Sequence, residues 1–428
     1  MFSVYVASRA KIKAAGRRQE AAIQLCRRQQ FIFLVPLVSL VFLVPISPTP
    51  HTLLPTPGSP FPVPSNNKQQ ITNDNRMMLQ PLREIQADAG ANFEEDSNVP
   101  RSFDNDTVAI AAARQTVAVA DRSHWGLIQI SGNDRLRFLH NQSTNDIQNR
   151  QPGESCDTVF INSTARTLDL ATAYFLNDVI WVLVSPNRRQ SLLEWLDRYV
   201  FPMDQVKLKD LTANYAIFSL IGPKSGELIA QLGAEDLQNQ PSGHHQVREL
   251  NGVAVRIARG NGLSDQGYTL MVPAPEAKRF WRMLMDLEVI PLGDRVWQHL
   301  RILQGRPAPD CELTEDYNPL EAGLWQTISF EKGCYIGQET ITRLNTYKGV
   351  KQYLWGLRFN GSATPGTPIT LDGEKVGLLT SYTDLEHPSF GLGYLRVKAG
   401  GAGLTVQLGE ATAEVVEVPF LTHVSMDK

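Results

Sequence analysis

The pattern of apolar and polar positions predicts strands and helices mixed along the first three quarters of the chain. Runs dense in β-branched residues predict strands, at Gly126–Ser131, Thr158–Ile161, Val179–Val184, Tyr215–Ile221, Val253–Arg259 and Tyr268–Val272. Helical patterns, several of them with apolar residues three or four positions apart, lie at Leu82–Ala91, Thr107–Gln115, Arg135–Gln142, Arg188–Tyr199, Lys224–Leu232, Pro275–Leu287 and Asp294–Gln304. This mixture predicts an α+β fold.

The pattern changes after Tyr347, where short strands follow one another at turn-rich spacing. We expect them at Gln352–Phe359, Pro368–Leu371, Glu374–Ser381, Phe390–Arg396 and Thr405–Glu410. No helical pattern separates them, which favours a small antiparallel β barrel. The chain is therefore expected to divide into an N-terminal extension (1–77), a main region (78–348) and a C-terminal barrel domain (349–428).

Charge and cysteine content exclude several classes of function. Residues 1–76 hold nine Lys and Arg against two Asp and Glu, whereas the remainder holds 32 against 42. A body this acidic is a poor general binder of nucleic acid, because phosphate neutralisation needs clustered cations. The four cysteines are widely spaced, with no CxxC pair, so we expect neither a disulfide framework nor a metal or iron–sulfur cluster held by this chain alone.

The N-terminal extension is open to three interpretations. Basic residues dominate positions 1–30, an apolar run follows at Phe31–Ile46, and Ser47–Pro64 is rich in proline. The basic-then-apolar order is typical of a targeting peptide. A membrane anchor would need about 20 apolar residues, so a stable membrane association is not expected. The third interpretation is that the natural chain starts at Met77 or Met78.

The segment Lys332–Glu339, with the sequence K-G-C-Y-I-G-Q-E, is the strongest candidate for chemistry. It brings a thiol, an ammonium, a carboxylate and two glycines together. A lysine two residues before a cysteine favours the reactive thiolate if the backbone brings the two together. We therefore expect Cys334 to be the reactive group and Lys332 to be its partner. The alternative is a turn with a buried structural cysteine.

This segment, with Asn318–Leu324 upstream and Arg343 downstream, resembles the signature of the YgfZ family. Members of that family are folate-binding relatives of the glycine-cleavage T-protein and assist iron–sulfur proteins. The resemblance runs from about Asp121 to the C-terminus. It is closest to the cyanobacterial and plastid branch at Phe138–Thr144 and Gly305–Pro309. It implies a T-protein-like ring of domains around a central folate cavity, with tetrahydrofolate or a one-carbon derivative as cofactor.

The resemblance also implies which residues form the site. Cys334 and Lys332 would be catalytic, and no metal ligands are expected. The residues expected to bind the cofactor are Asn162, Asp169, Glu321, Tyr335, Gln338, Glu339 and Arg343. Glu321 could accept the paired N–H groups of a pterin, or it could be a helix-capping or surface residue. Glu339 could orient the loop or form an ion pair with Arg343, four residues on.

One departure from the T-protein pattern bears on the reaction. T-protein relatives place a catalytic aspartate beside folate with a Gly-Gly-x-x-Asp-Asp-like segment, which corresponds here to Ser163–Leu170. The glycine pair is absent, and Leu170 stands in place of the second aspartate, so that Asp169 alone remains. Aminomethyl transfer is therefore the less favoured function.

Three functions follow from these observations. The first is a tetrahydrofolate-binding auxiliary factor for iron–sulfur protein assembly or repair that uses Cys334. The second is a folate-dependent aminomethyl- or methyltransferase, and the third is a non-catalytic folate-dependent adaptor. We expect a monomer with iron–sulfur client proteins as partners. Its location would be the cytoplasm, as in cyanobacterial members, or the chloroplast stroma or mitochondrial matrix if the extension is a transit peptide.

Overall fold

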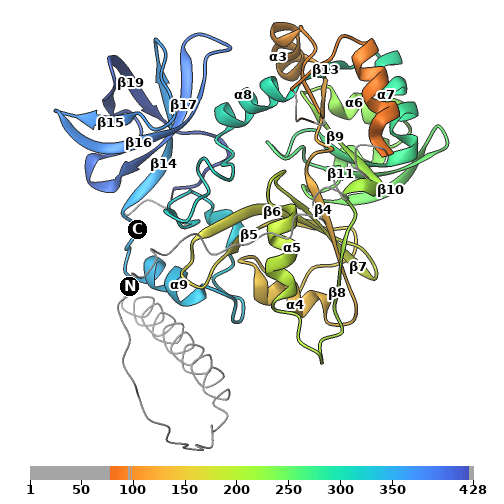
Figure 1. Ribbon diagram of the computed structural model, residues 1–428, viewed down its shortest axis with the longest axis horizontal. Helices are drawn as coiled ribbons and strands as arrows, with labels where there is room; N and C mark the ends of the chain where they lie inside the picture. Colours follow the sequence, from red (N-terminus) through yellow and green to blue (C-terminus); the bar gives the residue numbers. More distant parts are fainter. Residues whose placement is uncertain (1–77, 95–96, 98, 424–428) are drawn as a thin grey trace, which may run out of the picture. The chain divides into compact units, whose positions relative to one another are not determined.

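The computed structural model describes residues 78–94, 97 and 99–423. All three interpretations of the N-terminal extension fall on residues outside this part. The described part contains a six-stranded sheet, a five-stranded sheet, a closed barrel and a two-stranded sheet of β1 (Asn92–Phe93) and β2 (Pro100–Ser102) (Figure 1). A first helix covers residues 78–88. None of the helices in the described part is both long and apolar enough to cross a membrane.

The six-stranded sheet has the order β10-β11-β12-β9-β3-β13. Its strands are β3 (Ala118–Asp121), β9 (Tyr215–Ile221), β10 (His245–Leu250), β11 (Val253–Arg259), β12 (Tyr268–Pro273) and β13 (Ile290–Leu292). Only the β3–β13 pair is parallel. Alternate residues of β9 enter different cores, because successive side chains of a strand point to opposite faces. Phe218 packs with helices α6 (Ser225–Gln231) and α7 (Ala277–Asp286). Ile217 packs with α3 (Asp106–Gln115) and α8 (Asp294–Gln304).

The five-stranded sheet has the order β5-β6-β7-β4-β8. Its strands are β4 (Gly126–Ser131), β5 (Ser155–Ile161), β6 (Thr167–Phe175), β7 (Val179–Val184) and β8 (Lys207–Asp210). Helices α4 (Arg135–Gln142) and α5 (Arg189–Asp197) bury Phe138, Leu139 and Trp195 against one face (Figure 1). On the other face, Trp181 and Leu183 share a core with Ile217 of the six-stranded sheet. The two sheets therefore meet through a common apolar layer.

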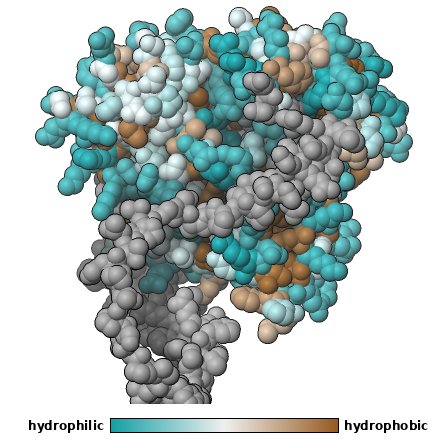
Figure 2. Space-filling view, viewed as in Figure 1, coloured by the Kyte–Doolittle hydropathy of each residue, from teal (hydrophilic) through white to brown (hydrophobic). Residues whose placement is uncertain are grey.

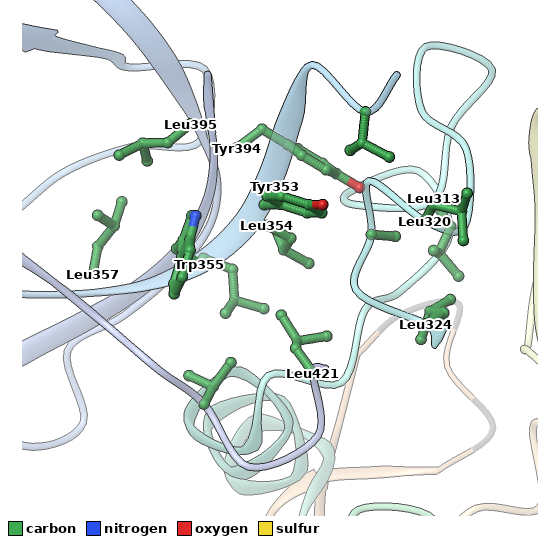
Figure 3. Packing of buried hydrophobic residues seen from close by; sticks show 14 of the residues in the cluster. Leu313, Leu320, Leu324, Tyr353, Leu354, Trp355, Leu357, Tyr394, Leu395 and Leu421 are labelled. Carbon is green, nitrogen blue, oxygen red and sulfur yellow. The ribbon is translucent and has the colours of Figure 1, made fainter. Parts of the chain in front are cut away.

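The C-terminal region closes into an antiparallel barrel with the order β14-β17-β16-β15-β18-β19. Its strands are β14 (Gln352–Phe359), β15 (Pro368–Leu371), β16 (Glu374–Thr383), β17 (Ser389–Arg396), β18 (Thr405–Leu408) and β19 (Ala411–Val416). The sequence pattern did not predict β19, which pairs with both β14 and β18 and so completes the barrel. Figure 3 shows Leu354 and Trp355 of β14 in the same apolar cluster as Leu320, Leu324 and Leu421. The barrel core is thus continuous with the segment before it, and the division at residue 349 stays a prediction.

A buried carboxylate joins the barrel to α8. Glu312 is fully buried, and its Oε1 accepts hydrogen bonds from Thr380 at 2.7 Å and Ser381 at 2.6 Å, both in β16. Arg301 of α8 donates to Oε2 at 3.1 Å. Buried charges are tolerated when they are both paired and hydrogen-bonded, so this network fixes the barrel against the helix. The molecular face shown in Figure 2 is largely hydrophilic over the described residues, with smaller hydrophobic patches.

Candidate functional site

The Lys332–Glu339 segment is built onto the C-terminal end of α4. A helix leaves its last four carbonyl groups without partners inside the helix. Three of those carbonyls find donors here, namely Leu139 from Ser143 Oγ at 2.9 Å, His140 from Lys332 Nζ at 2.5 Å, and Asn141 from Ile336 N at 3.1 Å. Two of the three donors belong to the candidate segment. The segment therefore caps the helix, and this capping holds the residues on both sides of Cys334.

Lys332 is buried, and its ammonium is bonded to backbone carbonyls. Besides His140, Nζ donates to the carbonyl oxygens of Ser143 and Asn145, each at 2.7 Å. These three bonds use all three N–H groups of an ammonium, and Nζ also lies 4.7 Å from the ring centre of Tyr335. Burial lowers the pKa of Lys332 to about 7, but a neutral amine has only two donors, so three close carbonyls favour the charged form. Lys332 thus fixes the loop; its effect on the Cys334 thiol stays a prediction.

Cys334 is exposed, whereas Tyr335 beside it is buried. The other two cysteines of the described residues are less accessible. Burial raises the pKa of Cys156 to about 12 and also raises the pKa of Cys311. The exposed side chain argues against the interpretation of Cys334 as a buried structural residue. It presents the thiol to any molecule that docks on this surface.

Gly337 sets the start of α9 (Gln338–Thr346). Its φ is +79°, and a Cβ at this position would lie 2.7 Å from the carbonyl oxygen of Asn162 and 2.8 Å from Ile161 Cδ1. Only glycine fits such a conformation and such a close approach without strain. Gln338 at the start of α9 is half-buried, while Glu339 and Arg343 are exposed.

Asn162 and Asp169 both make local hydrogen bonds. Asn162 Oδ1 accepts from the backbone N–H groups of Thr164 at 3.0 Å and Arg166 at 2.9 Å, which closes the turn before β6. Asp169 is fully buried and accepts from Ser185 N at 2.9 Å and Ser185 Oγ at 2.6 Å. Burial raises the pKa of Asp169 to about 6. These contacts account for both residues as stabilisers of the strand ends.

The segment Ser163–Leu170, compared above with the T-protein pattern, contains a turn residue with a left-handed backbone although the segment has no glycine. Ala165 has a φ of +62°, a conformation that favours glycine over residues with a side chain. Leu170, in place of the second aspartate, is buried in the core shared with the barrel. The turn shape is therefore present, but the position of the second aspartate carries an apolar core residue.

Glu321 has a capping arrangement of its own. Its Oε2 accepts from Asn318 N at 3.1 Å, and Asn318 Oδ1 accepts from the backbone N–H groups of Leu320 and Glu321. Such a reciprocal pair is the geometry of a capping box. Glu321 is buried, and this burial raises its pKa. Here the reciprocal pair closes a turn at 319–323 and does not start a helix, and the cofactor-binding role of Glu321 stays a prediction.

A cavity of about 530 Å³ lies elsewhere, between the two sheets and the C-terminal segment. Its charged and aromatic lining residues are Arg122, Arg150, Asp157, Tyr174, Arg259, Asp265 and Phe420. None of the residues expected to bind the cofactor belongs to the described lining, and neither does Cys334 or Lys332. Asn145 and Thr327 do line it. Asn145 accepts a hydrogen bond from Lys332, so the cavity wall and the Cys334 loop are directly connected.

The cavity lining combines carboxylates with more numerous guanidinium groups. Asp157 on β5 accepts from Thr172 at 2.6 Å. Arg122 donates to Ser219 Oγ at 3.1 Å and lies 3.7 Å from the ring centre of Trp125. Burial lowers the pKa of Arg122 to about 9 and raises the pKa of Tyr174 to about 12.

Sequence reasoning missed these lining residues. A carboxylate inside a strand, at Asp157, was the available signal. Within the described residues, no group of three or more His, Cys, Asp or Glu side chains is arranged to hold a metal ion.

Comparison with known proteins places this geometry in a family. The family model described as "GCVT N-terminal domain" matches residues 82–332. A chloroplastic protein of Arabidopsis thaliana named a "putative transferase" is 46% identical over 338 residues, which is 78% of each chain. An aminomethyltransferase of Herpetosiphon aurantiacus is 30% identical over 72% of this chain and 88% of its own length.

The solved structure of the glycine cleavage system aminomethyltransferase T from Bartonella henselae has the same fold. It matches 81% of this chain and 99% of its own, with a TM-score of 0.70 and 20% identity. The predicted α+β, T-protein-like fold with a C-terminal antiparallel barrel is confirmed. The chain belongs to the family described by the GCVT N-terminal domain.

Proposed function

We propose that this protein binds tetrahydrofolate or a one-carbon derivative in the 530 Å³ cavity and acts, through Cys334, as an auxiliary factor in the assembly or repair of iron–sulfur proteins. The observation that carries the proposal is the connection between cavity and thiol. Lys332 bonds to the cavity-lining Asn145 on one side and precedes the exposed Cys334 on the other. A ligand in the cavity and a partner protein at Cys334 would therefore contact two ends of one rigid segment.

The lining residues fit a reduced folate chemically. Ligand cavities commonly measure about 300–1,000 Å³, so the size suits one such molecule. Asp157 and Asn145 can pair with the polar edge of a pterin, and Tyr174 offers an aromatic face. Arg150 and Arg259 suit the carboxylates of a glutamate tail, because guanidinium groups bind carboxylates bidentately. The bound folate would supply a carrier for one-carbon groups.

Two sets of residues compete for this role. The sequence-based set includes Glu321, Asn162 and Asp169 and stays a prediction; the cavity set includes Asp157. Calorimetry with 5-formyltetrahydrofolate separates the two sets. We expect Asp157→Asn to weaken binding at least tenfold and Glu321→Gln to change it less than threefold. The opposite order would return the folate site to Glu321.

An exposed thiol suits a protein partner better than a ligand enclosed in the cavity. The test is complementation of a bacterial strain that lacks its own family member, scored by the activity of an iron–sulfur enzyme. Cys334→Ser is expected to fail and Cys311→Ser, the control, to complement. If Cys334→Ser complements fully, the third function applies, in which the protein is a non-catalytic adaptor.

A transferase of the T-protein type is the second candidate, because the Herpetosiphon aurantiacus relative is named an aminomethyltransferase. Leu170 is buried in the core, so one of the two lining carboxylates would have to serve such a transferase, and Asp157 is less exposed than Asp265. Release of a labelled one-carbon unit from methylenetetrahydrofolate, lost in Asp157→Asn but kept in Cys334→Ser, would favour this function.

The name of the Arabidopsis thaliana relative supports a chloroplast location over the cytoplasm or the mitochondrial matrix. Residues 1–77 fused to a fluorescent protein should then enter chloroplasts of a plant cell, while a fusion to residues 78–428 should not. Light scattering on the purified chain tests the expected monomer.

A further inference from the structure

Arg306, which follows α8, carries a buried guanidinium whose Nη1 has no hydrogen-bond acceptor among the residues that the structure describes. Its side chain is 4% exposed and lies 5.7 Å from the ring centre of Trp125 and 5.2 Å from that of Phe420. The Nη1 atom is itself fully buried. The Oδ2 atom of Asp157 is 3.9 Å from Nη1, which is beyond hydrogen-bond distance.

Burying the Arg306 guanidinium costs free energy unless a hydrogen-bond acceptor pairs with its N–H groups. A guanidinium has five N–H donors in a rigid fork, and a buried charged donor without a partner loses its hydration without compensation. Asp157 forms an ion pair with Arg306, but at 3.9 Å its Oδ2 accepts no hydrogen bond from Nη1. The donors of Arg306 are therefore available to an acceptor that enters beside Asp157 and Phe420, both of which line the cavity.

A second buried guanidinium lies at the same indole ring. Arg122 is 2% exposed, lines the cavity and lies 3.7 Å from the ring centre of Trp125. Its Nε has no hydrogen-bond partner within the described part of the chain. A Cβ at Gly262 would lie 2.6 Å from its Nη1, so the backbone there is shaped around the guanidinium. Arg122 and Arg306 thus lie at the same ring, and of the two Arg122 is the one that lines the cavity.

We propose that Arg122, in the cavity wall, and Arg306, which lies against the lining residues Asp157 and Phe420, form an anion subsite that takes one carboxylate group. The guanidinium fork matches a planar carboxylate. A phosphate dianion fits less well, because Asp157 already places a negative charge beside Arg306. The inference rests on the proposed function, in which the ligand's glutamate tail supplies the carboxylate. A separate small carboxylic acid has the same chemistry and is the other source.

Calorimetry on the full chain separates these sources. Wild type and Arg306→Gln are titrated with 5-formyltetrahydrofolate, with p-aminobenzoylglutamate, which lacks the pterin, and with 6-methyltetrahydropterin, which lacks carboxylates. We expect Arg306→Gln to weaken the first two at least tenfold and the third less than twofold. Arg306→Lys, which keeps the charge without the fork, should lose less than Arg306→Gln. Arg358→Gln, at an exposed barrel arginine, is the matched control and should change none of them.

A separate acid as the source gives a different pattern. Folate affinity would then be unchanged in Arg306→Gln, while binding of acetate would be lost. Equal binding of all probes, acetate included, by wild type and Arg306→Gln would overturn the subsite. Circular dichroism and the melting temperature show whether Arg306→Gln is folded.

A second measurement on the wild type needs neither an arginine variant nor folate. The fluorescence of Trp125 should respond to acetate but not to acetamide, its neutral isostere, and the response should disappear in Trp125→Phe. If folate fails to bind the wild type, the proposed function fails and the acetate titration still decides the subsite. An identical response to acetate and acetamide would count against it.

Discussion

The ammonium of Lys332 donates a hydrogen bond to the carbonyl oxygen of His140 at 2.5 Å, across 192 positions of sequence. Together with the bond from Ile336 N to Asn141 O, it closes the C-terminal end of α4. Lys332 therefore has a structural role, capping the end of α4, which its spacing from Cys334 in the sequence did not predict. Replacing Lys332 should therefore lower the stability of the fold.

We expect Lys332→Met to destabilise the fold. The substitution keeps the volume of the side chain but leaves three buried carbonyl oxygens without donors, and each unsatisfied group costs about 1–3 kcal/mol. Relief of the buried charge offsets part of this, so a loss of about 2–4 kcal/mol in the free energy of unfolding is expected. Denaturant titration measures it. Lys209→Met, at an exposed lysine of β8, is the control and should stay within about 0.5 kcal/mol.

Cys334 should be the first cysteine of the described residues to be alkylated at neutral pH. It is exposed, whereas burial raises the pKa of Cys156 to about 12 and also raises that of Cys311. A thiol reacts as its thiolate, so iodoacetamide should modify Cys334 at least tenfold faster than either, as followed by peptide mapping. Cys334→Ser should leave the unfolding free energy within about 0.5 kcal/mol, as is usual for surface positions. Equal rates at the three cysteines would contradict the proposal of a reactive site.

Gly337→Ala should be more harmful than its backbone angle alone implies. The left-handed conformation costs a residue with a side chain about 1–2 kcal/mol. The contact of 2.7 Å to the carbonyl oxygen of Asn162 adds about 1–3 kcal/mol, because the neighbouring strand end must shift. Gly373, with a φ of +83° and nothing within 4 Å of a built Cβ, provides a matched comparison. If Gly337→Ala and Gly373→Ala lose equal stability, the close approach to Asn162 has no energetic role.

Local pattern was enough to predict most of the fold. The expected strands at Val179–Val184 and Gln352–Phe359 and the expected helix at Asp294–Gln304 coincide with β7, β14 and α8. β7 and β14 are buried along most of their length, which dictates continuous apolar runs, and α8 buries Val296, Trp297 and Leu300 at helical spacing. β19 was missed because Ala411, Ala413 and Glu414 have low strand propensity, although its centre shows the alternating burial of a strand.

The candidate site was less predictable, because it depends on contacts between distant segments. Cys334 stood out through its motif, and its exposure is compatible with the expected role. The cavity residues Arg122 and Asp157 and the neighbouring Arg306 come from three separate segments and have no common local signal. A cofactor-binding role was predicted for Glu321 because a glutamate among apolar residues is often functional. In the structure its Oε2 accepts a hydrogen bond from the backbone N–H of Asn318, three residues earlier. Sequence alone cannot distinguish a local cap from a ligand contact.

The loop after α4, which contains Ile147 and Gln148, should loosen as the pH falls below neutrality, through His140. The Nδ1 atom of His140 accepts hydrogen bonds from Ile147 N and Gln148 N, each at 3.3 Å, so the ring is neutral in the folded chain. Burial, followed by the charge of Lys332, lowers its pKa from 6.5 to about 4. Between these two values the unfolded chain binds the proton and the folded chain does not. The free energy of unfolding therefore falls as the pH is lowered from about 6.5 to about 4.

The expected loss is about 2–3 kcal/mol, since one pKa unit corresponds to about 1.4 kcal/mol. His140→Asn keeps an acceptor near the position of Nδ1 but removes the titration. Denaturant unfolding of wild type and His140→Asn at several pH values between 7.5 and 4.5 isolates this contribution, because all other groups titrate in both proteins. The stability of His140→Asn should depend less steeply on pH over this range. Parallel curves would show that His140 is already free to take up a proton in the folded state, and that its two backbone hydrogen bonds do not hold the loop.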